Sequence, residues 1–292
     1  MDRKVNKRMV FQIISAIITN SYLKGFLKGN IYRGKLKNIC VPGLNCYSCP
    51  GAIGSCPIGS LQAVAGTVGY GVSLYTIGFI SLIGVLFGRL TCGFVCPFGL
   101  FQDIVYKIPI GKITINRKVD RILRSTKYLI LAIPVILLPI LLVGQLGISI
   151  PYFCKYICPA GTLEGGIPLV LLNEPLRQTI GFLFTWKMII LGIVVISSIL
   201  IYRPFCKYIC PLGAFYSFFN KISFYKYEID KSKCIDCNIC SKSCKMHIEP
   251  NRNPNHRECI RCGECVKVCS KKAIKKGFIF RIFSMRERKY KI

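Results

Sequence analysis

The residues best suited to chemistry are eighteen cysteines, four of which begin copies of the motif Cys-Pro-x-Gly-x-(Leu/Phe). The four copies begin at Cys56, Cys96, Cys158 and Cys210, and three of them have a further cysteine four residues earlier, at Cys92, Cys154 and Cys206. A proline after the cysteine suits the first turn of a helix, whose free amides then point at an anionic sulfur. Recurring thiolates favour iron–sulfur clusters and electron transfer. The alternative is that these thiols are buried small hydrophobes.

The C-terminal part contains two dense cysteine runs, Cys234-x2-Cys237-x2-Cys240-x3-Cys244 and Cys259-x2-Cys262-x2-Cys265-x3-Cys269. This is the spacing of two-cluster bacterial ferredoxins, in which the fourth cysteine of each run binds the cluster of the other run. We therefore predict one [4Fe-4S] cluster on Cys234, Cys237, Cys240 and Cys269, and a second on Cys259, Cys262, Cys265 and Cys244. Zinc is the alternative metal, but it normally uses two Cys-x2-Cys pairs and not four cysteines in one run.

The composition indicates an integral membrane protein. Hydrophobic residues make up 52% of the 292-residue chain, and Lys plus Arg number 41 against 12 Asp plus Glu. The basic residues stand between apolar stretches, as the positive-inside rule expects, and do not form one soluble face, so a nucleic-acid partner is not predicted. We expect membrane lipid as one partner and a cytoplasmic redox donor or acceptor protein as another.

The elements that must position the cysteines are apolar stretches long enough to cross a bilayer. We expect spans at residues 9–27, 64–88, 128–147 and 186–202, which place both termini in the cytoplasm of a multi-pass protein of the cell membrane. The predicted fold class is an α-helical membrane bundle of about four spans, internally duplicated, with a C-terminal α+β two-cluster ferredoxin-like domain. The predicted boundaries are 1–220 for the membrane domain, 221–280 for the ferredoxin-like domain and 281–292 for a basic tail.

The order of spans and motifs repeats in the two halves of the membrane domain, so an axis along the membrane normal can relate them. Such an axis brings together the inner motifs, whose ligands are Cys92, Cys96, Cys206 and Cys210. It also brings together the outer motifs, with Cys154, Cys158 and Cys56, a fourth ligand from Cys49 or Cys46, and Cys40 in reserve. We thus predict one further cluster at the inner motifs and another at the outer motifs. Disulfides among Cys40, Cys46, Cys49 and Cys56 are the alternative on the outer side.

Three parts of the sequence are typical of one known family, namely C92-G-F-V-C96-P-F-G, F205-C206-K-Y-I-C210-P-L-G and the paired C-terminal cysteine runs. Through them the chain resembles the membrane-bound polyferredoxins of the NapH, NosR and MauN type. The resemblance covers nearly the whole chain. It implies electron transfer between a quinone pool or a cytoplasmic donor and a partner redox protein. The large extracytoplasmic flavin-binding domain of the NosR type has no counterpart here.

The sequence lacks the motifs by which proteins usually bind haem. Only two histidines occur, His247 and His256, and no Cys-x2-Cys-His is present, so haem is not predicted. If a quinol is oxidised, Glu164 or Asp103 are candidate proton acceptors, and the alternative is that they are simple polar groups at an interface.

The predicted function is therefore an electron relay, and any enzymatic activity is that of a quinol-dehydrogenase-like subunit. One alternative is a quinol dehydrogenase subunit without a transmembrane relay. Another is a redox-sensing regulatory or metalloenzyme-maturation membrane protein.

Overall fold

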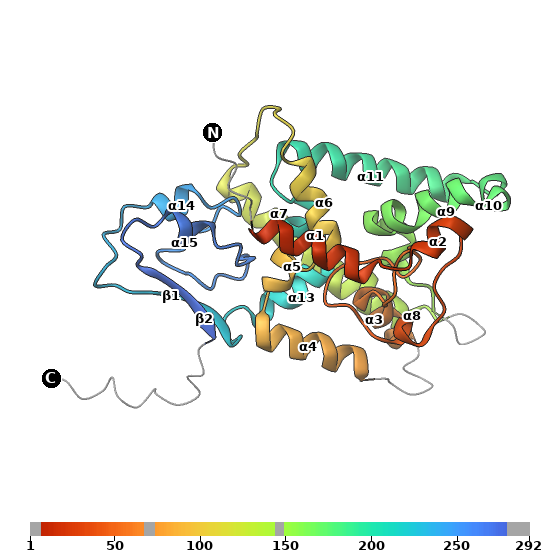
Figure 1. Ribbon diagram of the computed structural model, residues 1–292, viewed down its shortest axis with the longest axis horizontal. Coiled ribbons are helices and arrows are strands. Elements are labelled where there is room, and N and C mark those ends of the chain that lie inside the picture. The colour runs from red at the N-terminus through yellow and green to blue at the C-terminus, as the bar shows by residue number, and fades with distance from the viewer. Residues whose placement is uncertain (1–6, 67–73, 144–148, 279–292) are drawn as a thin grey trace.

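The computed structural model describes residues 7–66, 74–143 and 149–278, so the predicted basic tail at 281–292 lies outside the described residues. Within them the chain is mainly helical and has a single two-stranded sheet. Figure 1 shows the sheet and two short helices at one end of the molecule, and the remaining helices in the other part. We call residues 225–278, which contain both dense cysteine runs, the C-terminal segment.

The first half of the helical part contains many short helices. They are α1 (Lys7–Thr19), α2 (Leu23–Lys28), the single turn η1 (Lys35–Asn38), α3 (Pro57–Gly66), α4 (Tyr75–Phe87), α5 (Leu90–Phe94) and α6 (Pro97–Val105). Local chemistry ends two of them. The Thr19 hydroxyl and the Asn20 amide donate to carbonyls of the last turn of α1, and Gly88 takes a positive φ of 54° after α4, a conformation that suits glycine.

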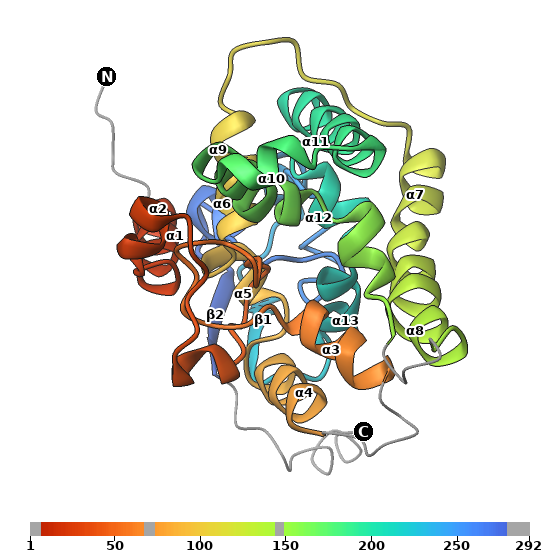
Figure 2. The ribbon, with the colours of Figure 1, turned by 90° about the vertical axis from the view of Figure 1, so that its right-hand side faces the viewer.

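The second half of the helical part contains the two longest helical stretches. Its elements are α7 (Arg117–Ile130), η3 (Leu131–Leu137), α8 (Leu138–Leu141), η4 (Phe153–Ile157), η5 (Gly161–Gly166), α9 (Ile167–Leu172), α10 (Glu174–Gln178), α11 (Phe182–Leu200), α12 (Pro204–Tyr208) and α13 (Pro211–Phe219). Pro134 lies inside η3, where the hydrogen bonds of the helix widen to π spacing. In Figure 2, α3 lies next to α4, α8 and α13, against all of which it packs.

The prediction of about four spans is wrong for the described residues. Only the continuous stretch Arg117–Leu141, with 25 residues, and α11, with 19, are long and apolar enough to cross a membrane. The first expected span is α1, whose 13 residues reach only about 20 Å, against the ~30 Å of a bilayer core. The second falls on α3, on residues 67–73 outside the described residues, and on α4, which also has 13 residues.

The C-terminal segment also differs from the predicted α+β ferredoxin-like domain. Its regular structure consists of β1 (Tyr225–Ile229) and β2 (Ile274–Phe278), paired antiparallel with Ile229 opposite Ile274, and of α14 (Ile239–Lys242) and α15 (Glu264–Val268). The helices have four and five residues, so most of the segment is loop.

Buried polar groups attach the C-terminal segment to the helical part. Asn220 follows α13 and donates to the carbonyls of His256 and Cys259 at 2.9 and 2.8 Å, while its own Oδ1 accepts from the Arg89 amide. Arg261, which is 1% exposed, donates to the carbonyls of Phe87 and Asn220. These bonds fix the loop that precedes α15 against the ends of α4 and α13.

Replacing Asn220 with alanine is expected to loosen this attachment. Each buried carbonyl left without its donor costs about 1–3 kcal/mol, so the C-terminal segment should open and be cleaved by added protease at least roughly tenfold faster. Limited proteolysis of the purified protein measures this rate. Asn251→Ala is the matched control, because the side-chain partners of Asn251 lie inside the C-terminal segment itself, and equal cleavage rates for the two variants would contradict the expectation.

Candidate metal centres

The Cys-Pro motifs begin helices, as the sequence predicts. α3, α6 and α13 each start at the proline that follows Cys56, Cys96 or Cys210. Cys96 and Cys210 occupy the N-cap position with extended backbone angles, and Cys158 ends η4 with similar angles. Each of these cysteine sulfurs therefore lies beside the free amides of a first helical turn.

The glycine of each motif supplies one of those amides. The Gly213 N–H donates to Cys210 Sγ at 3.3 Å. Burial raises the pKa of the Cys56 thiol to about 12, and the amide of Gly59, in the equivalent position, opposes that rise. A thiolate in such a buried place requires a cationic partner, which bound iron supplies.

Four of the predicted ligands, Cys92, Cys96, Cys206 and Cys210, come together around the start of α6 and α13, and we call this group the proximal site because it is near the C-terminal segment. All four are buried in one core cluster, and Cys210 interacts electrostatically with the other three. Gln102, six residues after Cys96, donates from Nε2 to Cys206 Sγ at 3.0 Å. The two halves of the chain thus contribute two cysteines each, and one half donates a hydrogen bond to the sulfur of the other.

A second group, the distal site, consists of Cys46, Cys56, Cys154 and Cys158, which line one cavity of about 540 Å³. Gln62, six residues after Cys56, donates from Nε2 to Cys154 Sγ at 3.1 Å. This contact repeats the one from Gln102 in the proximal site, so the sequence duplication has a structural counterpart.

Cys46, and not Cys49, is the fourth cysteine of the distal cavity. Cys49 is 4% exposed, and its Sγ lies 3.5 Å from the side-chain oxygen of Asn20. Cys40, the reserve ligand, contacts the Ser60 hydroxyl at 3.7 Å. All eighteen cysteines lie in the described residues, and none of them forms a disulfide.

The two candidate proton acceptors have opposite electrostatic environments. Burial favours protonation of Asp103, but Arg203 and Arg8 outweigh it and lower the pKa of this carboxyl. A carboxylate held ionised by two arginines is a poor proton acceptor at neutral pH. Burial raises the pKa of Glu164 to about 8, and Oε2 of this side chain accepts the Cys46 amide at 2.6 Å. Glu164 therefore positions the backbone of a distal-site cysteine.

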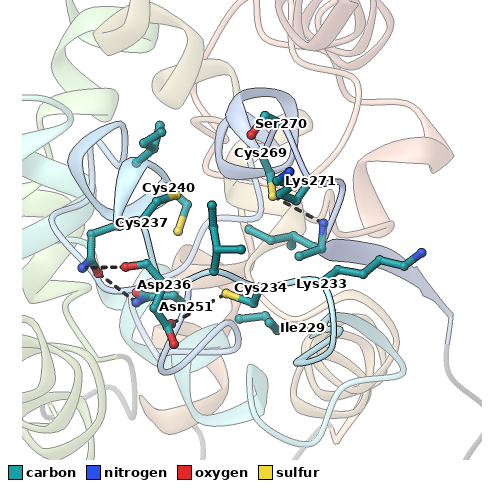
Figure 3. Close-up of a pocket in the computed structure, with 15 residues that line it drawn as sticks. Ile229, Lys233, Cys234, Asp236, Cys237, Cys240, Asn251, Cys269, Ser270 and Lys271 are labelled. Carbon is teal, nitrogen blue, oxygen red and sulfur yellow. Dashed lines mark hydrogen bonds between the residues drawn. The ribbon is translucent and has the colours of Figure 1, made fainter.

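The C-terminal segment brings its cysteines together in two groups. Cys234, Cys237, Cys240 and Cys269 line one cavity, and Figure 3 shows the sulfurs of Cys234, Cys240 and Cys269 around a common space. Cys259 interacts electrostatically with Cys262 and Cys244, and Cys265 interacts with all three. In each group the fourth cysteine comes from the other run. Asn238 and Gly263 occupy equivalent positions with positive φ, of 57° and 83°, just before the short helices.

Each of the four groups offers four sulfur ligands, which is the donor set of a [4Fe-4S] cluster. When bound, such a cluster accepts and releases one electron at a time. Within residues 7–66, 74–143 and 149–278, no three Cys, His, Asp or Glu side chains are arranged to hold a single metal ion.

Comparisons with known proteins agree with this donor set. A family described as "4Fe-4S binding domain" matches residues 68–118, 129–167 and 183–226, and each matched stretch contains one of the three Cys-x3-Cys pairs. The chain is therefore similar to 4Fe-4S ferredoxin-type electron-transport proteins. This similarity and the many cysteines support the binding of iron–sulfur clusters.

Several known proteins are similar to this chain over much of its length. An uncharacterised protein of Methanocaldococcus jannaschii is 27% identical over 66% of this chain and 66% of its own length. The putative electron transport protein YccM of Escherichia coli is 28% identical over 67% of this chain and 52% of its own, and the ferredoxin-type protein NapH of E. coli is 26% identical over 73% and 71%. The chain thus spans about two thirds or less of two of these relatives. No solved structure matches the chain.

The sequence alone did not point to several residues that surround the proximal and distal sites. Arg89 and Arg203 are fully buried beside the proximal site, each three residues before the first cysteine of its pair. The repeated spacing Arg-x2-Cys-x3-Cys-Pro was the available signal. Gly43, Leu44 and Gly93, which make the close contacts described below, gave no signal in the sequence, because their importance lies in what packs against them.

Proposed function

We propose that this protein relays electrons through four [4Fe-4S] clusters, two in residues 221–280, one at the proximal site and one at the distal site. The observation that supports this most strongly is a pair of close backbone contacts, one between the C-terminal segment and the proximal site and one between the proximal site and the distal site. Electron tunnelling weakens steeply as gaps widen, so the contribution of the chain is to hold these groups close together and in order.

The first contact joins the C-terminal segment to the proximal site. Ile260 follows Cys259, and its carbonyl oxygen would lie 2.4 Å from a Cβ atom at Gly93, the residue after Cys92. Two backbones meet here at the closest packing that glycine permits. Each of the two contacting residues directly follows a cysteine, Cys259 in one group and Cys92 in the other.

The second contact joins the proximal site to the distal site. Cys96 Sγ lies 3.9 Å from the Leu44 carbonyl oxygen, and a Cβ atom at Gly43 would lie 2.9 Å from Cys96 Cα. Leu44 is only two residues before Cys46, a span of at most about 7 Å of chain. Since Leu44 also lines the distal cavity, this loop forms a short protein bridge between the two sites.

The two helices of membrane-spanning length support a place in the cell membrane. Arg117–Leu141 and α11 run in opposite directions, because the Ile113 amide, before the first, donates to the Leu200 carbonyl at the end of the second. The ends that meet here carry most of the nearby basic residues, so the positive-inside rule puts them and the C-terminal segment on the cytoplasmic side. The N-terminal helix belongs on the same side, since Arg8 pairs with Asp103.

Electrons enter or leave on this side at the C-terminal segment, where Cys237 is exposed and can approach a soluble redox protein. The distal site is the opposite end of the relay. A quinone or a second redox protein is the proposed partner there, and the large, mostly apolar cavity beside Cys56 and Cys158 is compatible with a small uncharged partner.

Anaerobic iron and sulfide analysis of the purified protein, with EPR, tests the proposal. Four clusters give about sixteen irons per chain, and reduction should reveal more paramagnetic centres than the C-terminal segment alone can hold. About eight irons would confine the clusters to the C-terminal segment and refute the relay.

A further inference from the structure

Two buried arginines flank the proximal site in equivalent positions. Arg89 and Arg203 are both 0% exposed, and each reaches across to the other half of the chain. Arg203 Nη1 donates to the Cys92 carbonyl at 2.6 Å, and Arg89 Nη2 donates to the Cys206 carbonyl at 3.1 Å. The duplication therefore places one guanidinium on each side of the four cysteines.

Glycines leave room for both guanidinium groups. A Cβ atom at Gly99 would lie 3.3 Å from Arg203 Nη1, and one at Gly213 would lie 3.2 Å from Arg89 Nη2. These are the glycines of the two Cys-Pro-x-Gly motifs, so the motif has a second use besides its amide. Arg89 also keeps one donor free, because its buried Nε has no hydrogen-bond partner in the described residues.

Each arginine shares a carboxylate with a second basic residue. Asp103 pairs with Arg203 at 2.6 Å and with Arg8 at 2.8 Å, so two cations share one carboxylate. Glu258 likewise pairs with Arg89 at 2.6 Å and with Lys127 at 2.5 Å. Two cations and one anion leave one net positive charge in the group that contains Arg203, Arg8 and Asp103.

We propose that Arg89 and Arg203 are positioning residues that raise the reduction potential of a cluster at the proximal site. This inference rests on the proposed function. A core held by four thiolates carries net negative charge, which grows by one unit when an electron arrives, and a fixed positive charge in a buried site favours the more negative state. The electron would come from a cluster on the neighbouring cysteine group of the C-terminal segment, and that cluster would lose one electron. No proton moves, because arginine stays protonated.

Redox titration followed by EPR tests the inference on anaerobically purified full-length variants. The proximal signal is identified as the one that Cys210→Ser abolishes. Arg203→Gln removes the net positive charge of its group. At a given applied potential, the ratio of reduced to oxidised proximal cluster should fall at least about tenfold, which corresponds to a reduction potential lower by ~59 mV. Arg203→Lys retains the charge and should restore most of the wild-type potential. Asp103→Asn adds net positive charge and should shift the potential upward.

The opposite shifts in potential expected for Arg203→Gln and Asp103→Asn distinguish an electrostatic role of Arg203 from a structural one. Arg117→Gln is the control, because this exposed arginine pairs only at the surface, with Glu249, and its potential should equal that of the wild type. Shifts of the same sign in Arg203→Gln and Asp103→Asn, or equal shifts in Arg203→Gln and Arg203→Lys, would overturn the inference. If Arg203→Gln loses the signal, the Asp103→Asn variant decides, since only an upward shift supports the proposal. About eight irons in the wild type would instead refute the relay itself.

Discussion

Replacing Cys46 with alanine is expected to lower the iron content from about sixteen to about twelve per chain, while Cys49→Ala leaves it unchanged. The two cysteines are three residues apart in one loop, but only Cys46 lines the distal cavity with Cys56, Cys154 and Cys158. A cluster that loses one of four thiolate ligands is bound weakly or lost. Cys49 is oriented toward Asn20 and has no share in that cavity.

Iron and sulfide analysis of the two variants side by side makes this test sharp, because both remove one buried thiol from the same loop. The EPR signals of the other three groups should persist in Cys46→Ala, which shows that the protein still folds. Loss of about four irons in Cys49→Ala, with none lost in Cys46→Ala, would assign the fourth distal ligand to Cys49.

Replacing Gly93 with alanine is expected to slow electron transfer from the C-terminal segment to the proximal site without changing the iron content. The added Cβ would lie 2.4 Å from the Ile260 carbonyl oxygen, and backbone on both sides of the contact cannot move aside like a flexible side chain. Forcing an extra methyl group into such packing costs about 1–3 kcal/mol, enough to lower the ratio of docked to undocked C-terminal segment roughly tenfold. The gap that electrons must cross then widens.

Rapid-mixing experiments with a reductant measure how fast the proximal signal appears after the C-terminal clusters are reduced. Gly192→Ala is the matched control, because nothing lies within 4 Å of a Cβ atom at that position in α11. Equal rates in Gly93→Ala and Gly192→Ala would show that the Ile260 contact is not on the electron path.

Helical spans were the least predictable part of the fold. Residues 64–88 contain no charge, which predicted a full-length span. In the described residues, α3 ends at Gly66 and α4 covers Tyr75–Phe87, so neither helix has the length of a span. Hydropathy measures whether a stretch tolerates lipid, and it does not measure how long a helix is. The stretch Arg117–Leu141 shows the converse, since its polar first turns hid the true start of a 25-residue helix.

The fourth distal ligand could not be assigned for a related reason. Cys46 and Cys49 have the same local chemistry, and the sequence leaves the path of their loop open. Contacts from distant parts of the chain decide between them, since Glu164 accepts the Cys46 amide and Asn20 contacts Cys49. Such pairs, more than one hundred residues apart in the first case, have no signature in a single sequence.

What the sequence determined by itself was the donor chemistry. Cysteine type and spacing are local properties, so the Cys-Pro helix starts and the equivalence of the two halves could be inferred without coordinates, as could the similarity to an iron–sulfur family. Only the tertiary structure decided which cysteines meet, how backbones approach at Gly93 and Gly43, and where buried charges such as Arg203 lie. The physical reason is that distance and burial depend on packing between remote segments, whereas ligand type and helix capping depend on neighbours along the chain.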